Sequence, residues 1–92
     1  MELDALWDYA LETSDVFEQQ REFFFQVLEL LLREGAIDLI DMRTKVSMLG
    51  DVDEQLRAYL VAFPKDAREM DGGMWFFRET CPGGPLWRPE AP

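Results

Sequence analysis

Histidine is absent from this chain of 92 residues, and cysteine occurs once, as Cys81. Without histidine, the protein lacks the side chain used most often as a general acid or base near neutral pH. A single cysteine cannot form an internal disulfide, so we expect a protein of the reducing cytoplasm. A zinc site would need mostly carboxylate ligands, which zinc sites seldom use. The sequence therefore predicts no metal ion and no cofactor.

Long apolar runs and clusters of basic residues are missing as well. No segment approaches the length of about eighteen apolar residues that a membrane-spanning helix needs, and the beginning of the chain does not resemble a signal peptide. Nine Lys and Arg are scattered among nineteen Asp and Glu, and the formal net charge is -10. Nucleic acids and anionic membrane surfaces are bound through clustered basic residues, so we expect neither as a partner.

Acidic residues are concentrated at the beginning of the chain, where the first twenty residues contain six acids and no base. Apolar residues recur with helical spacing over residues 3–13 and place the acids on the opposite side of the predicted helix. Like charges three or four residues apart cost a helix about 0.2–0.5 kcal/mol per pair. Surface helices usually interleave the two signs, so we interpret this side as a surface for a basic protein partner. We call it the acidic face, and its residues are Asp4, Asp8, Glu12, Asp15 and Glu18.

The acidic face also has a simpler interpretation, because a very acidic protein needs solvated charge over much of its surface. Under that interpretation the five carboxylates contribute only to solubility. The two interpretations predict different effects of charge reversal on binding.

Two further helices are expected. The first spans about residues 15–34, where Asp15 can cap the first turn with Glu18 as its capping-box partner, and Gly35 can end the helix in a left-handed conformation. The second spans residues 51–63 and begins with the same spacing of two acids. Both have an apolar side that can pack in a core.

Three short strands are expected beside these helices. Residues 36–42 alternate between apolar and polar side chains. Residues 71–73 are a turn signal, after which residues 74–77 form an apolar run of strand-forming residues that residues 86–87 could join as a hairpin. We therefore predict an α+β fold with three α-helices packed on a small antiparallel sheet of about three strands.

The chain is long enough for one domain, which we expect to span residues 1–92 with a frayed tail at residues 89–92. No internal repeat or long linker divides it. A domain of this size has room for a single core and little room for a large buried cleft.

Two short groups of residues resemble a metal site or a catalytic site, but each lacks residues that such a site requires. The acids of residues 51–54 begin like a calcium-binding EF-hand loop, yet Leu56 and Ala62 stand where that loop needs its glycine and its glutamate. Cys81 lies beside a glycine-rich turn, but no histidine can serve as its base and Glu79 would raise the pKa of its thiol. We predict no catalytic residue and no enzymatic activity.

The second half of the chain carries a family resemblance. Its motifs resemble the C-terminal signature of small bacterial proteins that form the family numbered 596 among domains of unknown function. The motifs are Ala62-Phe63-Pro64-Lys65, Met70-Asp71, Trp75-Phe76-Phe77, Cys81-Pro82-Gly83-Gly84 and Trp87. The resemblance implies a compact α+β fold, no known catalytic activity, and a place among the immunity proteins that neutralise bacterial polymorphic toxins. It supplies no catalytic or ligand-binding residues.

These observations combine into one functional hypothesis and one alternative. The hypothesis is an acidic, cytoplasmic immunity protein that blocks a basic partner, such as the nuclease domain of a toxin, by occlusion through the acidic face. The alternative is a structural or regulatory module that self-associates, for example as a homodimer, through the apolar strand around Trp75 or through a helix surface. A small hydrolase would instead require a cleft that holds an isolated pair of carboxylates.

Overall fold

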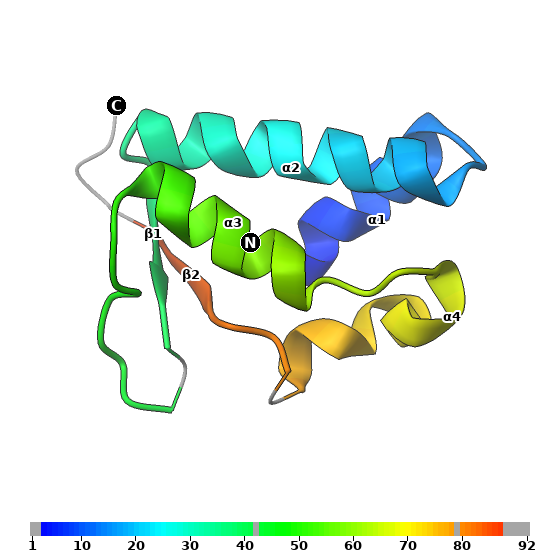
Figure 1. Cartoon of the computed structure of the whole chain (residues 1–92). Coiled ribbons are helices and arrows are strands. Elements are labelled where there is room, and N and C mark those ends of the chain that lie inside the picture. Colours follow the sequence, from blue (N-terminus) through cyan, green and yellow to red (C-terminus); the bar gives the residue numbers. More distant parts are fainter. Residues whose placement is uncertain (1–2, 42, 79, 88–92) are drawn as a thin grey trace.

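The computed structural model describes residues 3–41, 43–78 and 80–87, which fold as a mixture of helices and a small sheet (Figure 1). The predicted α+β class is confirmed. The tail predicted at residues 89–92 lies outside the described residues. In chain order the elements are α1 (Leu3–Thr13), α2 (Phe17–Arg33), β1 (Ile37–Ile40), α3 (Val52–Ala62), α4 (Ala67–Met70), the 3-10 helix η1 (Asp71–Phe77) and β2 (Gly84–Trp87).

Helix α2 is the longest element and organises the others. Figure 1 shows it along one side of the molecule, with the two strands at its C-terminal end. The side chains of Phe24 and Leu28 are fully buried. The Phe24 ring makes an edge-to-face contact with Trp7 of α1, with 6.0 Å between ring centroids, and packs on Phe63, just after α3, at 5.6 Å. Aromatic residues from several elements thus share one core.

The connection between α1 and α2 differs from the prediction. The N-cap of α2 is Val16, which makes no side-chain cap, so the capping box predicted for Asp15 and Glu18 is wrong. The Ser14 hydroxyl instead accepts a hydrogen bond from the backbone N–H of Val16 at 3.0 Å, and the buried Gln20 side chain donates to the Ser14 carbonyl at 2.6 Å. Ser14 and Gln20 therefore hold this turn, and the two carboxylates are not needed for it.

Other local signals are confirmed. The Glu54 backbone N–H donates to the Asp51 carboxylate at 2.9 Å, and the Asp51 N–H donates back to the Glu54 carboxylate at 3.5 Å, which completes the capping box of α3. Gly35, just after α2, has a φ of 73°, the left-handed conformation expected after a helix.

The sheet contains two strands within the described residues instead of about three. Strand β1 pairs antiparallel with β2, with Ile37 opposite Trp87 and Ile40 opposite Gly84. The expected hairpin between residues 74–77 and residues 86–87 is therefore wrong. Residues 74–77 do not form a strand, so they cannot pair with β2. Strand β2 pairs instead with β1, which lies far earlier in the chain.

Residues 74–77 belong to η1, and the burial of their side chains explains why. Trp75 is 4% exposed and contacts the core, whereas Met74 and Phe77 are 54% and 62% exposed. A strand would place Trp75 and Phe77 on the same side, but the helical winding of η1 separates them. The preceding turn has positive φ values of 50° at Asp71, 63° at Gly72 and 97° at Gly73, as its sequence predicts.

Helix α4 was not predicted at all, although its beginning carries a recognisable signal. The carboxylate of Asp66 accepts a hydrogen bond from the Glu69 backbone N–H at 2.9 Å, as a helix N-cap does. The helix comprises only four residues, Ala67–Met70, too few for an apolar periodicity to be visible. It buries Met70 and leads directly into η1.

Candidate functional site

Helix α1 arranges the acidic face as a line of carboxylates. Asp4, Asp8 and Glu12 follow one another at intervals of four residues, so they lie on one side of α1, about 6 Å apart along the axis. Asp15 lies in the connection that follows, and Glu18 lies in the first turn of α2. Asp4 is half-buried and the other four residues are exposed. The structure thus places the five along α1 and at the beginning of α2, with Asp4 at the N-terminal end of the line.

None of these five carboxylates forms an ion pair or hydrogen bond with another residue in the described part of the chain. Many later acids, in contrast, have a structural role. They cap helices, hold a turn or bind an arginine: Asp41, Asp51, Glu54, Asp66, Glu29, Asp53 and Asp71. Arg33, for example, binds Glu29 at 2.7 Å and Asp53 at 2.5 Å. The acidic face is therefore distinguished from the other acids by its lack of described partners as well as by its position.

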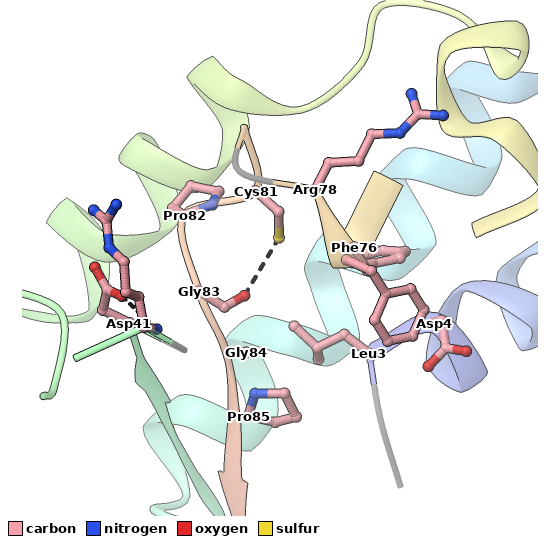
Figure 2. A pocket seen from close by; sticks show the side chains of 12 residues that line it. Leu3, Asp4, Asp41, Phe76, Arg78, Cys81, Pro82, Gly83, Gly84 and Pro85 are labelled. Carbon is pink, nitrogen blue, oxygen red and sulfur yellow. Dashed lines mark hydrogen bonds between the residues drawn. The ribbon is translucent and has the colours of Figure 1, made fainter. Parts of the chain in front are cut away.

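A pocket of about 610 Å³ opens at the Asp4 end of the acidic face (Figure 2). Figure 2 shows Leu3, Asp4 and Phe76 on one side of it and Asp41 on the other, with the chain from Cys81 to Pro85 between them. Four parts of the chain form its lining: Leu3 and Asp4, Asp41 and Arg43, residues 76–78, and residues 81–85. Half of these lining residues belong to the C-terminal motifs that carry the family resemblance.

Some charged groups around the pocket have a hydrogen-bond or ion-pair partner, and others have none among the described residues. Arg78 binds Asp71 at 2.6 Å. Asp41 accepts hydrogen bonds from the backbone N–H groups of Arg43, at 2.8 Å, and of Thr44, at 3.2 Å, and these hydrogen bonds lower the pKa of Asp41. Asp4 is the lining carboxylate for which the structure gives no such partner.

The wall of the pocket is attached to the core through Tyr59 of α3. The buried Tyr59 hydroxyl donates a hydrogen bond to the Gly83 carbonyl at 3.1 Å and lies 3.0 Å from the Cys81 sulfur. Burial raises the pKa of the Cys81 thiol above its ordinary value and raises the pKa of Tyr59 still further. A thiol with a raised pKa is protonated and weakly nucleophilic at neutral pH. Cys81 thus has the surroundings of a structural thiol, the interpretation that the sequence favours.

Stability is expected to fall as the pH rises above about 9, close to the ordinary pKa values of cysteine and tyrosine. Folding raises the pKa of both Cys81 and Tyr59, so the folded protein holds these protons more tightly than the unfolded chain does. Their contribution is complete at neutral pH and is lost as the pH rises through the raised values. Urea unfolding at about pH 7 and about pH 10 measures this loss.

The control for this prediction is Cys81→Ser, because serine keeps a hydrogen-bonding side chain but does not titrate in this range. We expect the variant to lose less stability than the wild-type protein between the two pH values. An equal loss in the two proteins would contradict a role for the Cys81 thiol.

The structure also bears on metal binding and on membrane insertion. The described residues contain no group of three or more histidine, cysteine, aspartate or glutamate side chains placed to hold a metal ion. No helix among them has the length and apolar character needed to cross a lipid bilayer.

The apolar strand face proposed for self-association is not formed. Trp75, at the centre of that segment, is already buried within the single chain and contacts Phe63 at 5.1 Å between ring centroids. Trp75 is therefore covered by its own chain and is not part of an exposed apolar surface. Met74 and Phe77 remain exposed, but on a helical turn instead of a strand.

Comparisons with known proteins agree with the resemblance seen in the sequence. The sequence model of the family described as "Protein of unknown function, DUF596" matches residues 32–90. A solved structure of an uncharacterized protein conserved in bacteria, from Neisseria meningitidis, superposes with a TM-score of 0.82 at 26% sequence identity. The superposition covers 98% of this chain and 71% of the other. Among curated proteins no significant match was found.

Proposed function

Because this chain belongs to DUF596, a family of proteins of unknown function, we propose its function from the arrangement of its charges. We infer an acidic, non-catalytic binding protein that neutralises a basic protein partner. The partner that best suits this arrangement is the nucleic-acid-targeting domain of a bacterial toxin, and the chain would then be its immunity protein in the cytoplasm.

The observation that carries the proposal is the contrast between two groups of acids. Many later carboxylates are engaged in caps, turns and ion pairs, whereas the five of the acidic face have no such partner among the described residues. Their mutual repulsion costs α1 stability without a compensating contact in the described structure. A basic partner would supply that contact on binding.

A nuclease domain offers matching chemistry, because it binds phosphates with lysine and arginine side chains. Five carboxylates along α1 and the beginning of α2 would attract such a surface and orient the encounter. Electrostatic attraction of this kind raises association rates by about 10- to 1,000-fold at low salt. It contributes to the rate and specificity of binding more than to the lifetime of the complex.

The absence of catalysis in this proposal is supported by the groups that line the pocket. The Cys81 thiol is protonated at neutral pH because burial raises its pKa. Asp41 is hydrogen-bonded by backbone N–H groups and has a lowered pKa, which makes it a poor general acid near neutral pH. We therefore assign the pocket to binding.

Reversing two charges of the acidic face should slow binding. With Asp8→Lys and Glu12→Lys together, we expect association with the partner to be about tenfold slower at low salt, because two of the five attracting charges become repulsive. At high salt the rates of variant and wild-type protein should converge, because screening removes the difference. Stopped-flow kinetics over a range of salt concentrations measures both effects.

The matched control makes the same change in net charge elsewhere. Glu34 and Glu69 are exposed and lie outside the acidic face, in the C-cap of α2 and in α4. We expect Glu34→Lys with Glu69→Lys to slow association far less. Equal slowing by the two double variants would mean that only net charge matters, and no slowing by either would remove the acidic face from the proposal.

The partner for these measurements is defined genetically. The protein encoded immediately upstream should end in a basic domain that arrests growth of a bacterial host when expressed alone. Co-expression of this chain should restore growth, and the two proteins should purify as a complex. An upstream product that is not toxic, or whose toxicity this chain leaves unchanged, would contradict the immunity role.

A further inference from the structure

We propose that the pocket at the end of the acidic face receives an arginine side chain of the basic partner, with its guanidinium paired to Asp4 and stacked on Phe77. The inference rests on the proposed function insofar as the arginine belongs to that partner. It adds a specific anchoring site to a surface that otherwise attracts by charge alone.

The pocket has the size and the lining for such a side chain. Its volume of about 610 Å³ lies in the range of small-ligand pockets, about 300–1,000 Å³. Leu3, Phe76 and Phe77 offer apolar surface against which the methylene groups of an arginine can pack. A long side chain with an apolar stem and a charged head fits this combination of apolar wall and carboxylate.

Phe77 is the aromatic ring available for stacking. The neighbouring Phe76 ring is committed to the core, with 5.4 Å between its centroid and that of Phe24 and 5.3 Å to that of Trp75. Phe77 is 62% exposed and has no ring contact within the described residues. Phe77 and Asp4 line the same pocket, and an exposed aromatic ring together with an unpaired carboxylate is a combination that recognises an organic cation.

The charges of the pocket favour a cation over an anion. Arg78 is bound to Asp71, and the charge of Arg43 lies close to that of Asp41. Asp4 is left as the carboxylate without a described partner. An anionic ligand would have to approach Asp4 and Asp41, and it would compete with Asp71 for Arg78 and with Asp41 for Arg43. A guanidinium would meet an available acceptor at Asp4.

Arginine suits the site better than lysine does. The guanidinium is planar, so it can stack on an aromatic ring while its N–H groups donate two parallel hydrogen bonds to a carboxylate. Asp4 also belongs to the acidic face. A partner that lies along α1 would therefore bring its side chains to the mouth of the pocket.

The test uses blocked arginine, N-acetyl-arginine N-methylamide, as a probe in an NMR titration of the whole chain. We expect saturable shift changes in the backbone amides of residues 3–4, 76–78 and 83–84. The citrulline counterpart of the probe, which has nearly the same shape and no charge, should leave these signals unchanged. Asp4→Asn should weaken arginine binding about fivefold, and Phe77→Ala should weaken it about threefold.

Met74→Ala is the matched control, because Met74 is also exposed on η1 but does not line the pocket. It should leave arginine affinity unchanged, and the amide spectra of all variants should show a folded protein. Absence of saturable shifts at these amides, equal shifts with citrulline, or unchanged affinity in Asp4→Asn would each overturn the proposal.

Failure of the pocket and failure of the acidic face give different results. The double variant Asp8→Lys with Glu12→Lys should still bind the arginine probe within about twofold, because screening leaves little effect beyond the residues that touch the ligand. If this variant slows association with the partner while the pocket shows no arginine binding, the proposed function stands and the anchoring site does not. If the pocket binds arginine but the double variant associates with the partner as fast as the wild-type protein does, the pocket is an arginine site and the acidic face does not attract the partner.

Discussion

Replacement of Phe24 by alanine is expected to lower the free energy of unfolding by about 3–5 kcal/mol, the cost of deleting a large buried ring. Phe24 is fully buried at the centre of the aromatic core, and its ring contacts those of Trp7, Phe25 and Phe63. Domains of this size have a total stability of about 5–14 kcal/mol. The variant should therefore lose a large part of its stability. Urea unfolding followed by tryptophan fluorescence measures the change.

The matched control for this substitution is Phe77→Ala, the same chemical change at a residue that is 62% exposed. It should cost less than about 0.5 kcal/mol, because little packing is lost. Similar losses for the two variants would mean that Phe24 is not the centre of the core.

The second large effect is expected for Gly83→Ala, which should cost about 1–3 kcal/mol. A Cβ atom at Gly83 would lie 2.5 Å from the Ile40 carbonyl oxygen and 3.1 Å from the Met48 sulfur. Because Ile40 is the last residue of β1, the added methyl group would push the chain before β2 away from its partner strand. Urea unfolding and amide exchange of residues 37–40 would report the loss and its location.

The control for Gly83 is Gly72→Asn. Gly72 has a φ of 63°, and a Cβ atom added there would meet no described atom within 4 Å beyond its chain neighbours. Asparagine tolerates this left-handed conformation better than most residues do. The cost should stay below about 1 kcal/mol, with amide exchange in β1 unchanged. Faster exchange in β1 for the Gly72 variant would contradict a local role of Gly83.

The elements that the sequence predicts correctly are those with a local physical cause. The capping box of Asp51 and Glu54 fixes the beginning of α3, and Gly35 follows α2 in the expected left-handed conformation. The turn at residues 71–73 has the predicted positive φ values. In each case the residues that determine the backbone conformation lie within a few positions of one another.

The sequence-based predictions are wrong where contacts between residues distant in the chain determine the local structure. Residues 74–77 have the composition of a strand, and a short apolar run does not show whether its period is that of a strand or of a helix. Burial of Trp75 against Tyr59 and Phe63 selects the helical form. The partner of β2 is likewise set by tertiary packing, which no pattern within residues 84–87 specifies.

Of the candidate site, the acidic face could be predicted from the sequence and the pocket could not. Helical periodicity alone places Asp4, Asp8 and Glu12 on one side of α1. The spacing of Asp15 and Glu18 predicts a capping box, which Ser14 and Gln20 make unnecessary. The pocket could not be predicted, because its walls come from segments that only the folded chain brings together. Tyr59, which attaches one wall to the core, is a buried residue of an amphipathic helix in the sequence and carries no signal of that role.

The pairing of β1 with β2 also bears on how the protein is made. The two strands are about 45 residues apart, and ribosomes add about 5–20 residues per second. Strand β1 therefore waits roughly 2–9 s for its partner to be synthesised. During this interval Ile37, Leu39 and Ile40, all buried in the finished fold, lack their sheet partner. We therefore expect the nascent chain to be open to aggregation through β1 until β2 has left the ribosome and paired with it.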